Sequence, residues 1–282
     1  MRREGEANLR EIALSSQFDN LARYIFSGAV RVLSVAANFV FSVVVTRSLS
    51  IEDAGTFFLM FAILSVLSFI LGFGLENYVI RLVGITSASV PKKDGINRLI
   101  KIIVPIILFG LFVAVILSRN SGVLSEQVFE NASMGEPFSI IVFSVAAMTG
   151  IILIGAALQG LMFISTSIFV TRIIVPIVVG LLIGLAHVDT LIGLSKLFLT
   201  VVWLVVLLGG LLLYLAWPSE TKTSLRDTGG RRSHPKLTAG VLLSLAFIGV
   251  FQQLSQWSGQ LIAGVFLPSS DVAILAVSQR TA

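Results

Sequence analysis

The sequence predicts an all-α polytopic membrane protein, and three observations support this fold class. Hydrophobic residues make up 56% of the 282 positions and charged residues only 12%, whereas a soluble domain carries about 25% charged residues. Apolar runs of about 20 residues, the length at which a helix crosses a hydrocarbon core of roughly 30 Å, recur along the whole chain. These runs are continuous rather than alternating, which favours helices over the strands of a membrane barrel.

The N-terminal segment 1–23 is polar and charged, which predicts a cytosolic tail. It contains neither the apolar core nor the small-residue cleavage site of a secretory signal peptide. We therefore expect the protein to be anchored by its own spans. The chain has no cysteine, which excludes disulfides and thiolate metal sites.

Hydropathy predicts seven complete spans and the start of an eighth near Val272. The predicted domains are the cytosolic tail (1–23), a six-helix N-terminal lobe with a basic cytoplasmic loop (24–238), and the first one to two helices of a second lobe (239–282). The chain thus looks truncated within that second lobe. The seven spans are 24–46, 55–75, 99–118, 138–158, 164–186, 194–217 and 239–266.

Lysine and arginine residues predict the orientation, because they stay on the cytoplasmic side. The tail 1–23 holds four of them, and 76–101 and 218–238 hold five each. The connections on the opposite side hold one, Arg119. We therefore expect a multi-pass protein of the inner (plasma) membrane with a cytoplasmic N-terminus. The net charge of +5 is then a topology signal and gives no reason to expect a nucleic-acid partner.

An internal repeat relates the two ends of the chain. The turn after the first span, 49–55, aligns with the turn after the seventh, 267–273, at an offset of 218 residues. The same offset superposes polar residues inside the preceding spans. It places Ser34 on Gln252, Asn38 on Gln256 and Ser42 on Gln260.

Each set of polar residues forms a stripe, because residues four apart share one face of a helix. Arg31 extends the first stripe. A polar stripe on a membrane helix faces the bundle interior or a water-filled cavity rather than lipid, and interhelical hydrogen bonding is the alternative role. Six spans separate the two copies, so both have the same orientation, as in transporters built from parallel repeats.

Several short motifs resemble those of a known family. The run 46–57, with Leu49, Glu52, Asp53 and Gly55, resembles the leucine-glycine-proline-glutamate-glutamate-tyrosine-glycine turn after the first helix of O-antigen and polysaccharide flippases. These proteins belong to the multidrug/oligosaccharidyl-lipid/polysaccharide exporter superfamily. The sequence departs from that turn at Ser50, where glycine is usual, and at Ala54, where an aromatic residue is usual. Two further runs, 71–75 followed by Arg81 and 157–160, resemble the end of the second helix and the turn between the fourth and fifth.

The resemblance implies two six-helix bundles around a central cavity that opens alternately to each side. It also implies the substrate, an undecaprenyl-pyrophosphate-linked oligosaccharide (an O-antigen or exopolysaccharide unit) that moves from the cytoplasmic to the periplasmic leaflet. Polymerases or ligases of the same glycan are candidate partners, and no cofactor is implied. A multidrug or cation antiporter of the same superfamily is the nearest alternative, although no acidic residue is central in the seven complete spans.

Such a substrate needs cations for its pyrophosphate and hydrogen-bonding groups for its sugars inside the membrane. Arg31 and Arg172 are the best cations, because a guanidinium pairs with phosphate oxygens through two donors. Snorkelling of either side chain to the interface is the alternative. The glutamines of the seventh span suit sugar hydroxyls. The predicted substrate-binding residues are Arg31, Ser34, Asn38, Arg172, Gln252, Gln256 and Gln260.

Nothing in the sequence predicts an enzyme. The two histidines, His187 and His234, lie in connections on opposite sides, and the spans show no paired carboxylates, no metal-ligand spacing and no phosphate-binding glycine loop. A membrane-embedded enzyme of glycan assembly is the less favoured alternative, because it would need a larger loop outside the membrane. We therefore predict no catalytic and no metal-binding residue.

Overall fold

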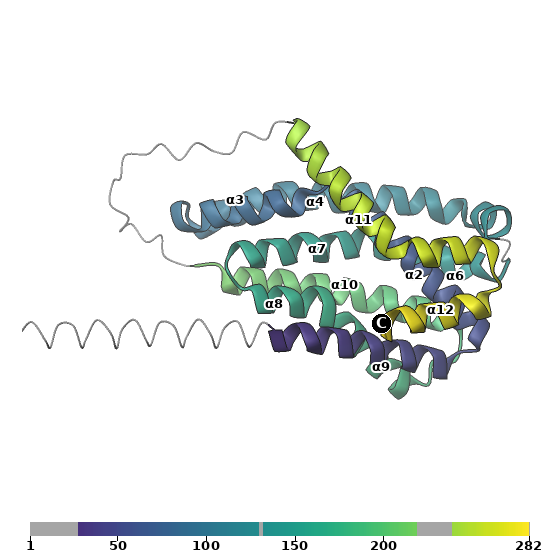
Figure 1. Cartoon of the computed structure of the whole chain (residues 1–282). Coiled ribbons are helices and arrows are strands. Elements are labelled where there is room, and N and C mark those ends of the chain that lie inside the picture. Colours follow the sequence, from purple (N-terminus) through teal and green to yellow (C-terminus); the bar gives the residue numbers. More distant parts are fainter. Residues whose placement is uncertain (1–27, 130–131, 219–238, 282) are drawn as a thin grey trace, which may run out of the picture.

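The computed structural model describes residues 28–129, 132–218 and 239–281. Within these ranges the regular structure is helical, without a strand, which confirms the all-α class. Long helices lie side by side and run back and forth along one direction (Figure 1). Six segments are long and apolar enough to cross a membrane, so the chain is a polytopic helical membrane protein. These are the first helix (Gly28–Ser48), α2 (Ile51–Leu71), α4 (Lys92–Arg119), α6 with α7 (Gly135–Gly160), α8 with α9 (Ile164–Ala186) and α10 (Leu191–Ala216).

The first six predicted spans agree with these segments to within a few residues at most ends. The seventh predicted span coincides with α11 (Ala239–Phe266), and α12 (Ser269–Thr281) begins close to the predicted eighth. That α11 crosses the membrane stays a prediction, because it is not among the six segments. The predicted tail, 1–23, and nearly all of the basic loop 218–238 lie outside the described residues.

The gap predicted between the second and third spans, 76–98, is mostly helical. It contains α3 (Leu75–Ser89), which packs against α7 (Ser144–Gly160). A Cβ on Gly160 would lie 2.6 Å from the carbonyl oxygen of Ile80 and 2.8 Å from the Cβ of Val83, so a small residue is needed for this close contact. Hydropathy missed α3 because it measures apolar length rather than helicity.

Short turns join α4 to the next span at the far end of the bundle. The chain reverses its direction there. Two of these turns, α5 and η1, directly follow the end of α4. The elements are α5 (Ser121–Val123), the π-helical turn η1 (Leu124–Val128), the 3₁₀ turn η2 (Ala132–Met134) and α6 (Gly135–Ile141).

The core of the bundle lies around α2 and α7. The span that contains α7 is 78% buried and α2 is 72% buried, whereas α4 is only 22% buried, so α4 is the helix with most surface for lipid. Helix α7 contacts α2, α3, α4 and α10. Its small residues allow this, because a Cβ on Gly150 would lie only 3.1 Å from the side chain of Ile107 on α4. Close packing over small residues replaces the hydrophobic effect as the force that joins helices in lipid.

The internal repeat predicted from the turns has a counterpart in the helix ends. The first helix ends at Ser48 and α2 begins at Ile51. Helix α11 ends at Phe266 and α12 begins at Ser269, each 218 residues further along. Figure 1 shows both turns at the same end of the molecule, with α2 and α12 both running away from it. The two hairpins therefore have the same direction.

Equivalent positions of the two hairpins meet each other. Helix α12 makes extensive contact with α2. A Cβ on Gly55 would overlap the carbonyl oxygen of Ser269 and would lie 3.2 Å from the backbone nitrogen of Ala273, which is the residue equivalent to Gly55. Contact between equivalent residues is the signature of a two-fold relation between two units.

Candidate functional site: a polar cluster at a π turn

The second span ends at Leu71, and a three-residue turn joins α2 to α3. Phe73 and Gly74 have positive φ angles of 48° and 64°, in the left-handed region that a bulky residue such as phenylalanine rarely adopts. The N–H of Gly72 donates to the carbonyl oxygens of Ser68 and Phe69, each at 3.1 Å, and so closes α2. Helix α3 then begins at Leu75, and Glu76 lies in its first turn.

The fifth span contains a π-helical turn. It consists of α8 (Ile164–Ile168), the π turn η3 (Phe169–Ile173) and α9 (Ile174–Ala186). The Ser167 hydroxyl donates to the carbonyl oxygen of Gly155 at 2.8 Å and accepts from the amide nitrogen of Gln159 at 3.1 Å, which holds α8 on α7. The π turn carries Arg172, and such turns are frequent at functional sites.

Asn38 links the first helix to this π turn. Its side-chain nitrogen Nδ2 donates to the carbonyl oxygen of Arg172 at 3.2 Å and to that of Ser34 at 2.8 Å. The Ser34 hydroxyl in turn donates to the carbonyl oxygen of Arg31 at 2.7 Å. Ser34 and Asn38 therefore face a neighbouring helix, and the structure brings Ser34, Asn38 and Arg172 together. The side chains of Arg31 and Arg172 are exposed at the edge of this cluster.

Glu76 belongs to the same cluster, although we did not predict it as a site residue. It lies in α3, outside the six apolar segments. Burial raises the pKa of its carboxyl group, and the positive charge of Arg172 lowers it by a smaller amount. Arg81, in the same helix, is exposed, and Arg172 is the cation whose charge Glu76 feels. A carboxylate two residues after a glycine-containing turn was the available signal.

The second stripe lies on α11. Gln252 and Gln256 are exposed, whereas Gln260 is only 1% exposed. The side-chain oxygen of Gln260 accepts no hydrogen bond from any described residue. Between these glutamines, Trp257 packs edge-to-face on Phe61 of α2, with ring centroids 5.7 Å apart. That the two stripes line one cavity stays a prediction.

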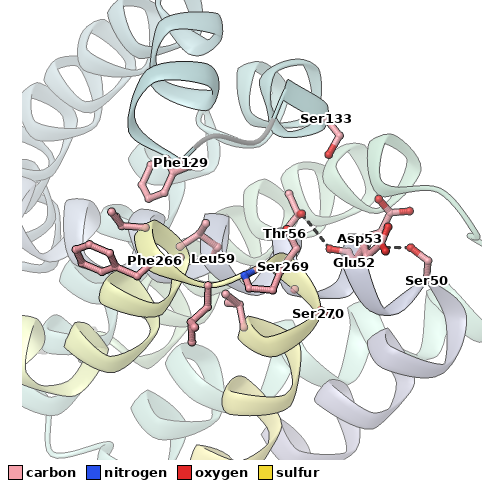
Figure 2. A pocket seen from close by; sticks show the side chains of 16 residues that line it. Ser50, Glu52, Asp53, Thr56, Leu59, Phe129, Ser133, Phe266, Ser269 and Ser270 are labelled. Atoms are coloured by element: carbon pink, nitrogen blue, oxygen red, sulfur yellow. Dashed lines mark hydrogen bonds between the residues drawn. The ribbon is translucent and has the colours of Figure 1, made fainter.

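A recess of about 630 Å³ lies between the two repeat turns, at the opposite end of the bundle from the basic start of α4. None of the seven predicted site residues lines it. Figure 2 shows the first turns of α2 on one side, the α11–α12 turn beside them, and Phe129 and Ser133 across the recess. The sequence aligned the two turns with each other, but nothing in it indicated that they would meet.

Charge differs between the two ends of the bundle. The start of α4 carries Lys92, Lys93 and Arg98, and the ammonium of Lys92 lies 4.1 Å from the ring centre of Tyr214, near the end of α10. At the turn end, carboxylates gather around the recess and a neighbouring one of about 330 Å³. They are Glu52, Asp53, Glu136 and Asp189. Among the described residues, no three histidine or acidic side chains group as metal ligands.

Comparison of the chain with protein-family models gave no match, and searches among curated proteins and among solved structures gave none either. The resemblance to flippases therefore depends on the motifs themselves.

Proposed function

We propose that this chain is part of a transporter of the inner membrane that flips an undecaprenyl-pyrophosphate-linked oligosaccharide to the periplasmic leaflet by alternating access. The single observation that carries the proposal is the polar and cationic cluster at the π turn of the fifth span, beside the first helix of the parallel repeat. Transporters place their binding sites at irregular membrane helices near the interface of their repeats, and π turns inside helices are frequent at functional sites.

The chemistry of the cluster supports an anionic substrate. Asn38 holds the first helix against the π turn, so the backbones that carry Arg31 and Arg172 are fixed relative to each other. Both guanidinium groups are exposed at the edge of the bundle. Guanidinium groups suit a pyrophosphate, whose oxygens accept paired hydrogen bonds.

The charge of the two ends supports the direction of transport. The start of α4 is basic and the turn end is acidic. By the positive-inside rule the basic end is cytoplasmic, as is the N-terminus. An anionic head group made in the cytoplasm would then meet the arginines from the basic side, and glycan polymerases or ligases would receive the product at the acidic side.

A proton- or cation-coupled antiporter is the second candidate, and Glu76 favours it. Such antiporters need a carboxylate that changes its protonation or ion occupancy during the cycle. A partly buried carboxyl group with a raised pKa beside Arg172 meets this need. The same residue could also couple glycan transport to protons, so the nature of the substrate separates the two candidates.

The test measures binding of farnesyl-pyrophosphate-linked disaccharide to the chain in lipid nanodiscs. We expect Arg31→Ala to weaken binding about ten- to a hundredfold, because one charge-assisted contact contributes about 1.5–3 kcal/mol. Arg31→Lys should be intermediate, since lysine keeps the charge but loses the two-pronged geometry. Arg119→Ala is the matched control and should bind the ligand as the parent does. Arg119 is an exposed arginine at the last residue of α4.

Equal binding by Arg31→Ala and the parent would make Arg31 a snorkelling residue and remove the main support for a pyrophosphate substrate. If the antiporter candidate is correct, the disaccharide ligand will not bind, and an organic cation such as tetraphenylphosphonium will bind in a manner that Glu76→Gln abolishes.

A further inference from the structure

The recess between the repeat turns has a defined shape because glycines let the two hairpins touch. A side chain at Gly55 would overlap the backbone of Ser269, and one at Gly264 would overlap Leu59. The volume of about 630 Å³ lies in the range in which proteins bind small organic ligands. We call this space the turn recess. It is lined by Ser50, Glu52, Asp53, Gly55, Thr56, Leu59, Phe129, Ser133, 264–270 and Val272.

The lining of the turn recess excludes an anionic ligand. It contains two carboxylates, Glu52 and Asp53, and no lysine, arginine or histidine. The adjoining recess shares Asp53 and Ser133 and adds the carboxylates of Glu136 and Asp189. Because these carboxylates are negatively charged, they repel an anionic ligand such as a phosphate or a uronic acid. A neutral or cationic ligand is the kind that this surface accepts.

The same lining matches the two surfaces of a sugar ring. Hydroxyl groups of a sugar donate hydrogen bonds to carboxylates, and such charge-assisted bonds are stronger than neutral ones. The C–H faces of the ring pack on apolar surface, which Leu59, Phe129 and Phe266 supply (Figure 2). Serine and threonine hydroxyls from α2 and from the α11–α12 turn complete the set.

The acidic side of the recess is held in place by the start of α2. The Ser50 hydroxyl accepts the backbone N–H of Asp53 at 3.1 Å, which caps the helix. The Thr56 hydroxyl donates to the carbonyl oxygen of Glu52 at 3.0 Å. Both contacts are visible in Figure 2. The carboxylates thus project from an ordered helical turn, which lowers the entropy cost of binding a ligand.

We infer that the turn recess is a binding site for neutral or amino-sugar units of an oligosaccharide, formed jointly by the two repeat turns. This inference rests on the proposed function for the origin of the sugar, the glycan part of the lipid-linked substrate. It adds a second contact region, at the opposite end of the bundle from the arginines. A ligand in the recess touches both hairpins, so it also stabilises the contact between α2 and α12.

The test uses the chain in nanodiscs and three short oligosaccharides of equal ring number, with binding measured by saturation-transfer NMR and calorimetry. The probes are triacetylchitotriose (neutral), chitotriose (cationic) and trigalacturonic acid (anionic). We expect the first two to bind and the third to bind at least tenfold more weakly. A neutral probe that binds no better than trigalacturonic acid would overturn the inference.

Variants locate the site. The double variant Glu52→Gln and Asp53→Asn should weaken both favoured probes at least tenfold, and the cationic one more. Ser133→Trp fills the recess from its exposed rim, away from the contact of α2 with α12, and should also abolish binding. Glu126→Gln is the matched control, since Glu126 is an exposed carboxylate in η1 and is not part of the lining. Full binding by both recess variants would place the sugar elsewhere.

This result is separable from that of the arginine test. The three probes carry neither lipid nor pyrophosphate, so their failure to bind leaves the effect of Arg31→Ala on a pyrophosphate ligand unchanged. In the reverse case, the sugars bind and Arg31→Ala has no effect. The recess is then retained as a sugar-binding site, and the pyrophosphate substrate is rejected.

Discussion

The two hairpins of this protein share a plan and differ in chemistry. The first consists of the helix Gly28–Ser48 and α2, and the second of α11 and α12, with turns at matching positions 218 residues apart. Both polar stripes end in a buried residue next to the turn, Ser42 in the first hairpin and Gln260 in the second. At this end of the stripes the equivalent residues are therefore both buried, whereas Ser34 is buried and its equivalent Gln252 is exposed.

The difference lies at the other end of each stripe. The residue equivalent to the exposed Arg31 is Gly249, where a Cβ would overlap the ring of Phe69 on α2. A cation at that place would have to displace the aromatic ring. One hairpin therefore presents a charge and the other is packed tightly against α2 and offers only amides. The two hairpins thus share the position of their turns, while only the first carries the cation proposed to bind an anion.

The largest expected effect is in a labelling experiment that tests whether the two hairpins run in the same direction. Its outcome at each site is all-or-none. Ser50→Cys and Pro268→Cys occupy equivalent exposed positions of the two turns, and Lys93→Cys lies at the opposite end of the bundle. Because the chain has no cysteine of its own, an impermeant maleimide added to intact cells reports each site singly. We expect both turn cysteines to be labelled from outside and Lys93→Cys to be labelled only after permeabilisation.

Labelling of the two turns from opposite sides would show that the repeat is not parallel. Labelling of Lys93→Cys alone from outside would keep the repeat but reverse the orientation, and with it the proposed direction of transport.

The next largest effect concerns the contact between the hairpins. We expect Gly55→Leu to destabilise the folded chain by about 3 kcal/mol, because an added side chain must displace the backbone of α12. Unfolding in mixed detergent micelles can be followed by tryptophan fluorescence, to which Trp257 beside Phe61 contributes.

Gly184→Leu is the control for this substitution. A Cβ on Gly184 meets nothing within 4 Å, and both substitutions bring the same gain in helix propensity of about 1 kcal/mol. Their difference therefore measures the contact of α2 with α12. If the two variants unfold alike, the hairpins do not pack as described.

Apolar length predicted most of the fold, because the bilayer imposes it, whereas the orientation that the charge bias indicates stays a prediction. Six of the predicted spans and the ends of α11 agree with the structure. Helix α3 could not be predicted in this way. It is held by packing of Ile80 and Val83 on Gly160, and such contacts between distant residues leave no periodic signal in a sequence of mixed polarity.

The candidate site could be predicted only in part. Residue spacing placed Ser34 and Asn38 on one face, and the hydrogen bond of Asn38 to the backbone of Arg172 agrees with an inward-facing stripe. The place of Glu76 near Arg172 depends on the left-handed turn at Phe73 and Gly74 and on the π turn at Phe169–Ile173. Irregular backbone of this kind depends on tertiary contacts, so the sequence indicated the residues but not their meeting. The turn recess is a further case, because it exists only where two distant turns touch.

The smallest effect concerns how α2 is joined to its own lobe, in contrast to its glycine contact with the second hairpin. The buried Thr149 of α7 donates from its hydroxyl to the carbonyl oxygen of Ser68 on α2 at 3.0 Å, and to that of Val145 in its own helix at 2.9 Å. The Ser68 hydroxyl lies 3.3 Å from the same Val145 oxygen. Hydrogen bonds between membrane helices contribute about 0.6 kcal/mol on average and rarely more than about 1.7 kcal/mol. Thr149→Val, which keeps the shape and removes the donor, should therefore lower stability by about 0.6 kcal/mol in the same unfolding assay.

Thr200→Val is its control, because Thr200 is exposed and its hydroxyl bonds only to Lys196 within α10. If Thr149→Val lowers stability more than Gly55→Leu does, polar contacts within the lobe hold α2 more tightly than its close packing against α12, which is the opposite of the contrast described here.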